Sequence, residues 1–116
     1  MIDGFEEYTK DLSDWELQVA RKVWNYFNRI PGWSTNKQIR ENLKQNGVNI
    51  DGSRFRKIMN WLHLHGHLPN LVASNKGYKI AESREELKKY IQSLDQRIKP
   101  IEARKKMAQK DLNNFN

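Results

Sequence analysis

The sequence predicts a mainly α-helical fold with one small β-hairpin and a long helix near the C-terminal end. Three observations predict this fold class. The helix-start pattern Ser/Thr-x-x-Glu/Gln precedes stretches of helical periodicity at Ser13, Thr35 and Ser83. Between residues 71 and 80 the apolar pattern changes to that of two short strands. A length of 116 residues suits one domain with an appended helix rather than two full cores.

The first helix is expected to start after Ser13, with Glu16 completing the capping box, and to run to about Asn28. Residues 1–12 are acidic and are expected to be a flexible lead-in. Trp33 is a candidate for a very short strand before the next helix. The core-facing positions of the first helix are Val19, Ala20, Val23, Trp24 and Phe27.

Two shorter helices are expected next. Thr35 caps the first of them, which ends at Asn46-Gly47 because glycine accepts a left-handed conformation. The other spans Gly52–His65 and is capped by either Asp51 or Ser53. Apolar positions expected to be buried in this region are Ile39, Leu43, Val48, Ile50, Phe55, Ile58, Met59 and Leu62.

A β-hairpin and a long helix complete the prediction. Residues 71–73 and 78–80 form the strands, Gly77 supplies a positive φ in the turn, and Tyr78 packs onto the domain. The last helix covers residues 83–112, where Pro100 is expected to produce a kink near Gln96. Residues 113–116 are expected to be disordered.

Three helices followed by a hairpin is the order of a winged helix-turn-helix domain, here residues 13–82. The tract from Ile50 to Ile80 resembles the small winged-helix proteins encoded in bacteriophage and prophage genomes. The residues that carry this resemblance are Ile50-Asp51-Gly52-Ser53, Phe55-Arg56-Lys57-Ile58, Trp61-Leu62, Leu68-Pro69, Lys76-Gly77-Tyr78 and Ile80. The resemblance covers residues 15–105 and implies the same fold.

The distribution of charge favours binding to nucleic acid. The formal net charge is +7, but residues 1–16 alone carry −5. Residues 37–79 carry +6, which can attract phosphates. On the predicted third helix, the face opposite the core carries cations and an amide suited to phosphates and base edges. The candidate DNA contacts are Ser53, Arg54, Arg56, Lys57 and Asn60 on this helix, Asn75, Lys76 and Lys79 on the hairpin, and Lys37, Arg40 and Lys44 on the second helix. For each of these three sets of residues, the alternative is that the charges are simply exposed to solvent and contact no DNA.

Other classes of chemistry are not expected. The chain has no cysteine, and His63, His65 and His67 lack further ligands nearby, so we expect no metal site, no cofactor and no enzymatic activity. The histidines suit the negative end of a helix dipole instead. No apolar run is long enough to span a membrane and no signal peptide is recognised, so we expect a cytoplasmic protein, in the bacterial host if it is phage-encoded.

The last helix carries an apolar stripe with alternating spacings of three and four residues, interrupted by Lys105. This stripe favours a homodimer, and packing on the first helix is the alternative. The stripe includes Ile91, Leu94, Ile98, Ile101, Ala108 and Leu112.

Together these features predict a DNA-binding protein that acts in transcriptional or replication control. The predicted third helix would enter the major groove and the hairpin would hold adjacent backbone of double-stranded DNA. The alternative is an interaction module that binds and modulates a host or phage protein, favoured by the acidic, aromatic lead-in. Binding of single-stranded nucleic acid is a third option, although most aromatic side chains are predicted to face the core.

Overall fold

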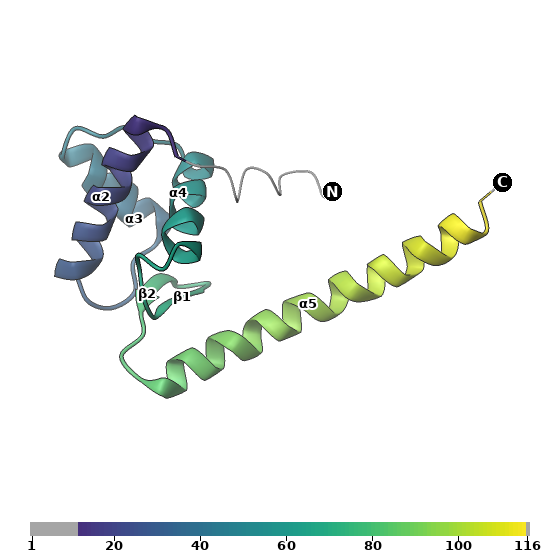
Figure 1. Ribbon diagram of the computed structural model, residues 1–116. Coiled ribbons are helices and arrows are strands. Elements are labelled where there is room, and N and C mark those ends of the chain that lie inside the picture. The colour runs from purple at the N-terminus through teal and green to yellow at the C-terminus, as the bar shows by residue number, and fades with distance from the viewer. Residues whose placement is uncertain (1–11, 116) are drawn as a thin grey trace. The chain divides into compact units, whose positions relative to one another are not determined.

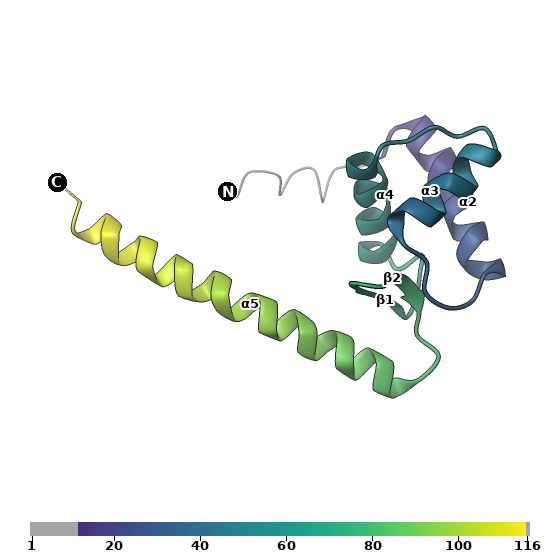
Figure 2. The ribbon, with the colours of Figure 1, turned by 180° about the vertical axis from the view of Figure 1, so that it is seen from behind.

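The structure, a computed structural model, describes residues 12–115 and confirms the mainly helical fold with one hairpin and a long C-terminal helix (Figures 1 and 2). Residues 1–11 of the expected lead-in and Asn116 lie outside the described part. The elements, in order, are α2 (Asp14–Arg29), α3 (Asn36–Gln45), α4 (Gly52–Leu64), β1 (Leu71–Ser74), β2 (Gly77–Ile80) and α5 (Arg84–Asn113).

Local capping residues determine where the helices begin. Ser13 and Glu16 form a complete capping box on α2, and Thr35 and Gln38 form another on α3. Asp51, rather than Ser53, is the N-cap of α4, where its side chain accepts a hydrogen bond from the Arg54 backbone N–H at 2.8 Å. The helix ends differ from prediction by one residue: α2 and α5 end one residue later, and α4 ends one residue earlier.

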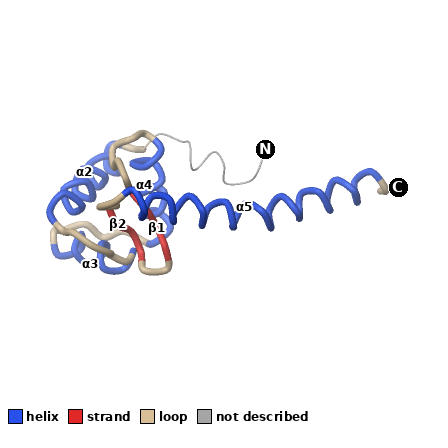
Figure 3. The backbone as a smooth tube through the Cα atoms, turned by 90° about the horizontal axis from the view of Figure 1, so that it is seen from below, coloured by secondary structure: helices blue, strands red, loops and turns tan. Residues whose placement is uncertain are grey.

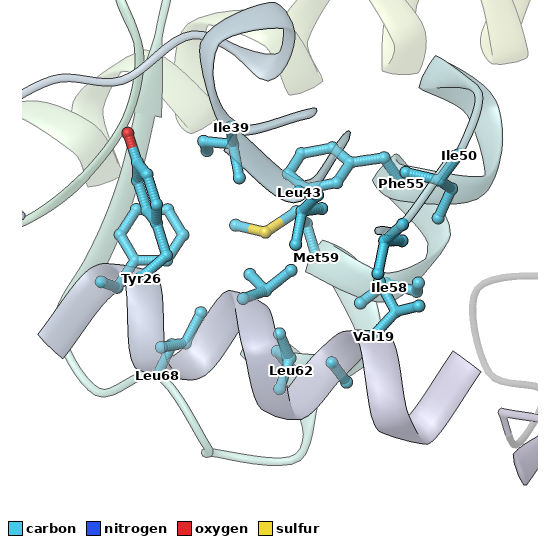
Figure 4. Packing of buried hydrophobic residues seen from close by; sticks show 14 of the residues in the cluster. Val19, Tyr26, Ile39, Leu43, Ile50, Phe55, Ile58, Met59, Leu62 and Leu68 are labelled. Atoms are coloured by element: carbon cyan, nitrogen blue, oxygen red, sulfur yellow. The ribbon is translucent and has the colours of Figure 1, made fainter. Parts of the chain in front are cut away.

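One hydrophobic core joins α2, α3, α4 and the start of β1 (Figure 4). Phe55, Ile39 and Ile58 are completely buried in it. Leu12 is also buried, so the packed domain begins within the segment that the sequence predicts to be a flexible lead-in. Trp24 was predicted to face the core, but it is 44% exposed.

The hairpin is fixed to the helical part through Ser34. Ser34 and Tyr78 exchange two backbone hydrogen bonds, of 2.9 and 2.8 Å, one residue beyond the short strand predicted at Trp33. The buried Ser34 hydroxyl also lies 2.8 Å from the Tyr26 hydroxyl. Gly77 has a φ of 110°, and a Cβ atom at this position would lie 2.2 Å from the Ser34 carbonyl oxygen. The turn therefore requires glycine for its conformation and for the close approach of the backbone.

The chain divides after Glu82 into two compact units, and the second consists of α5. The Ser83 hydroxyl caps this helix by accepting from the Glu86 backbone N–H at 3.3 Å. The helix continues through Pro100 without a break and ends at Asn113, so the predicted disordered end begins with a helical residue. None of the described helices combines the length and the apolar character that a membrane crossing needs.

Candidate nucleic-acid interface

Helix α4 has a buried side and an outer side, as its sequence predicts. Phe55, Ile58, Met59 and Leu62 are buried. Leu64 is 66% exposed at the end of the outer side. The candidate contact residues on α4 all reach beyond the core, namely Ser53, Arg54, Arg56, Lys57 and Asn60. They do not form one group, however, because their side chains turn toward two different neighbours.

Two of these cations turn toward α2 and pair with Glu16. The Lys57 ammonium lies 2.9 and 3.0 Å from the two Glu16 carboxylate oxygens, and Arg54 Nε lies 3.4 Å from one of them. The Glu16 side chain is only 3% exposed, and that of Lys57 is 26% exposed. The Arg54 guanidinium also lies over the Trp15 ring, 4.8 Å from its centroid.

The protonation of Glu16 reflects this environment. Burial on its own would raise the pKa of Glu16, because it disfavours the charged form. Hydrogen bonds from the Ser13 backbone, Lys57 and the Ser13 side chain, together with the positive charge of Lys57, instead lower the pKa to about 2. Glu16 is therefore ionised at neutral pH and holds α4 against the start of α2.

A second group lies where α3 meets the start of α4. The position that a Cβ atom would take on Gly52 is 3.8 Å from guanidinium nitrogens of both Arg40 and Arg56, and equally far from Asn36 Oδ1. Arg40 Nε donates a hydrogen bond to Asn36 Oδ1, and Arg56 donates to the Ser53 hydroxyl at 3.3 Å. The two positive side chains thus converge on the first turn of α4, where unpaired backbone N–H groups also favour negative charge.

The remaining cations of α3 continue this second group. Lys37, Arg40 and Lys44 line a shallow hollow of about 250 Å³ together with Glu41, Asn49 and Ile50. Within residues 12–115, no carboxylate comes within 4.0 Å of the charged groups of Lys37, Arg40, Lys44 or Arg56. These four cations, unlike Arg54 and Lys57, are free of ion pairs in the described chain.

The hairpin supplies the last candidate residues. Asn75 and Lys76 form the exposed two-residue turn, and the Lys76 backbone N–H donates to the Ser74 hydroxyl at 3.0 Å. Lys79 lies farther back, with its ammonium 5.9 Å from the centre of the Trp33 ring. The turn projects on the side of the domain where α3 lies, away from α2 (Figure 3). We use the name basic face for Lys37, Arg40, Lys44 and Arg56 together with Lys76 of the hairpin turn.

Two of the three histidines contact an aromatic ring. The rings of His65 and His67 stack on Trp61, with centroid distances of 4.6 and 5.0 Å. His65 Nδ1 donates to the Trp61 carbonyl oxygen at 2.9 Å, and the same carbonyl accepts from the His65 backbone N–H at 3.0 Å. No group of three potential ligand side chains suited to a metal ion occurs within the described residues.

Glu16 and Asn36, which hold cations of α4 and α3 in place, are not among the candidate residues that the sequence predicts. Asn36 could have been found, because it precedes Arg40 by four residues on the same helix. Glu16 could not, because its capping role already explains it locally and Lys57 is 41 residues away.

Comparison of the chain with protein-family models, curated proteins and solved structures finds no match. The geometry of the basic face is therefore the basis on which a function can be proposed.

Proposed function

We propose that the chain is a winged-helix DNA-binding protein. In this proposal α3 and α4 form the helix-turn-helix, α4 enters the major groove, and the β1–β2 hairpin is a wing that contacts adjacent backbone. The role that fits best is transcriptional or replication control of the kind served by small bacteriophage and prophage proteins.

The observation that carries this proposal is the convergence of Arg40 and Arg56 on the first turn of α4. Two guanidinium groups close together repel each other in the free protein, and a phosphate between them would remove that repulsion. The neighbouring Lys37 and Lys44 can hold flanking phosphates. Asn60, farther along α4, carries the amide group that hydrogen-bonds adenine edges.

The proposal gives Arg54 and Lys57 a different task from the one that the sequence predicts. Their pairing with Glu16 supports a role in orienting α4, which must be held rigidly if a few side chains are to meet base edges. On binding, the five cations of the basic face, which form no ion pair within residues 12–115, are the ones available to replace counterions on DNA.

A salt titration of binding to random duplex DNA, followed by fluorescence anisotropy, tests the proposal. If each of the five cations meets one phosphate, the logarithm of the binding constant should fall with the logarithm of salt concentration with a slope of about −4 to −5 per protomer. Involvement of all eight candidate cations would give a slope of about −7. An absence of binding at low salt would reject the proposal.

Variants that remove single charges test whether the basic face is the surface that binds DNA. Arg40→Gln and Arg56→Gln should each weaken binding and make the slope shallower by about 0.9. Arg21→Gln removes the same charge from the exposed side of α2 and serves as the matched control. Equal loss in the control would show that net charge, rather than this face, determines binding.

Binding to a protein partner is the second candidate function. On α2, Leu17 and Trp24 are 41% and 44% exposed and line an open hollow with Trp61 and His67. Exposed apolar side chains that gather in one hollow are typical of protein contact sites. The acidic aromatic tract that favours this function in the sequence lies outside the described residues. Failure to bind DNA at low salt would favour this candidate.

A further inference from the structure

The apolar stripe of α5 has the pattern of a coiled-coil seam. With Ile91 at position a of a heptad, Ile98 is the next a residue, and Leu94 and Ile101 are d residues. Leu87 continues the frame toward the start of the helix, and Ala108 and Leu112 continue it toward the end. Ile91, Ile98 and Ile101 are 57%, 46% and 56% exposed, and no residue of α5 is buried. A single helix in its own unit cannot cover such a stripe.

We propose that α5 pairs in parallel and in register with α5 of a second copy of this chain, forming a two-stranded coiled coil. Arg97 of each copy forms an ion pair with Glu102 of the other copy. This inference goes beyond the proposed function and does not depend on DNA binding.

The residue types at the seam favour two strands. Isoleucine occupies the a positions 91 and 98, and leucine occupies the d positions 87 and 94, the first two layers of d residues, while Ile101 and Ala108 fill the last two. A β-branched residue at a with leucine at d favours parallel dimers over trimers and tetramers. Lys105 falls at the next a position, where a polar side chain specifies the register while lowering stability.

The flanking charges favour the parallel orientation. In a parallel pair, the g residue of one helix faces the e residue of the next heptad in the other helix. Arg97 is a g residue and Glu102 is the e residue that it faces, so two symmetric ion pairs form. Within α5 neither side chain already has an ion pair, and Arg97 makes only a 3.5 Å hydrogen bond to Ser93.

The antiparallel alternative brings like charges together. When the two stripes overlap fully in that orientation, g residues face g residues and e residues face e residues. Arg97 would then face Arg104 of the second copy. Asp95 would face Glu102 of the second copy. Both pairs of flanking side chains would then carry like charges and repel each other.

Pro100 is compatible with this arrangement because it lies at position c, away from the seam. Its missing N–H leaves the Gln96 carbonyl oxygen without its helical donor. Gln96 is an f residue, on the face opposite the seam, where water can satisfy that carbonyl. The helix accordingly continues through Pro100 without burying an unpaired group.

Sedimentation equilibrium of the full chain over a concentration series tests the pairing. We expect a reversible dimer, and a monomer at every concentration would overturn the proposal. Arg97→Glu alone and Glu102→Arg alone should each weaken association by about tenfold, because each places two like-charged pairs across the dimer. An equimolar mixture of the two variants should recover association, since the heterodimer restores both ion pairs. Failure of the mixture to recover would reject the parallel register.

Crosslinking tests the register of the two helices without a measurement of the dissociation constant. The chain has no cysteine, so a single Leu94→Cys substitution allows only a bond between copies. In a parallel, in-register pair, position 94 faces its own counterpart, and mild oxidation should give a disulfide-linked dimer. Ala103→Cys, at an f position, is the matched control and should remain monomeric on a denaturing gel. Equal crosslinking of the two variants, or none in Leu94→Cys, would contradict the proposed seam.

Discussion

Glu16 has two roles. Its carboxylate accepts a hydrogen bond from the Ser13 backbone N–H at 3.0 Å as part of the capping box, and it also neutralises Lys57. A buried carboxylate is stable only when its charge is compensated in this way. The cation on α4 thus makes burial of a capping residue possible, and that residue in turn fixes the start of α4 beside α2.

The first prediction concerns pH. The pKa of Glu16 is lowered from 4.5 to about 2, so its ionised form stabilises the folded state by about 3 kcal/mol above pH 4.5. This contribution should disappear as the pH falls from 4.5 to about 2. Glu16→Gln keeps a capping side chain but removes the charge. Urea unfolding of both proteins should show a difference near pH 6 that vanishes near pH 2, and a difference constant with pH would show that charge is not the cause.

The second prediction concerns Gly77. Gly77→Ala would place a methyl group 2.2 Å from the Ser34 carbonyl oxygen, so the hairpin would have to separate from Ser34. We expect a loss of at least about 3 kcal/mol in the free energy of unfolding. Gly47→Ala is the matched control, because Gly47 also has a positive φ, 83°, but open space around its Cβ position. It should lose only about 1 kcal/mol, and equal losses would mean that the contact with Ser34 is unimportant.

At the scale of elements, the helices were predictable because their signals are local. Capping patterns and glycines located each helix within one residue, and the turn at Ser74–Gly77 indicated the hairpin. Polar contacts between elements were not predictable. Nothing near Ser34 in the sequence indicates its pairing with Tyr78, 44 positions later. Likewise, a helical wheel places Lys57 on the outer side of α4, but its long side chain reaches back to Glu16.

The third prediction separates the two groups of cations on α4. Lys57→Gln leaves the buried charge of Glu16 poorly compensated and should lower stability by about 3 kcal/mol. Adding Glu16→Gln should cost little more than Lys57→Gln alone, so that the two single losses are far from additive, as a double-mutant cycle would measure. Arg56→Gln, which breaks no ion pair within the described chain, should change stability by less than about 0.5 kcal/mol while weakening DNA binding. A stability loss as large as that of Lys57→Gln would mean that Arg56 is structural.

At the scale of the whole molecule, the two units use apolar side chains differently. The first unit buries its apolar side chains in one core, in which the described residues run from Leu12 to Leu71. None of the described residues of the second unit is buried, and its isoleucines are exposed. Folding of the first unit and association through α5 should therefore be separable.

The fourth prediction tests that separation by removing residues 83–116. Because the core contains no residue of α5, the first unit should stay folded in the shortened chain. Its helical circular dichroism and its melting temperature, both measured at low protein concentration, should be unchanged. The shortened chain should also lose self-association.

Its affinity for a duplex with two binding sites should fall by about a hundredfold, because the second domain is no longer tethered to the first. Its affinity for a duplex with a single site should stay within about twofold. A shortened chain that unfolds would show that α5 covers part of the core, and unchanged affinity on the two-site duplex would show that α5 does not join DNA-binding domains.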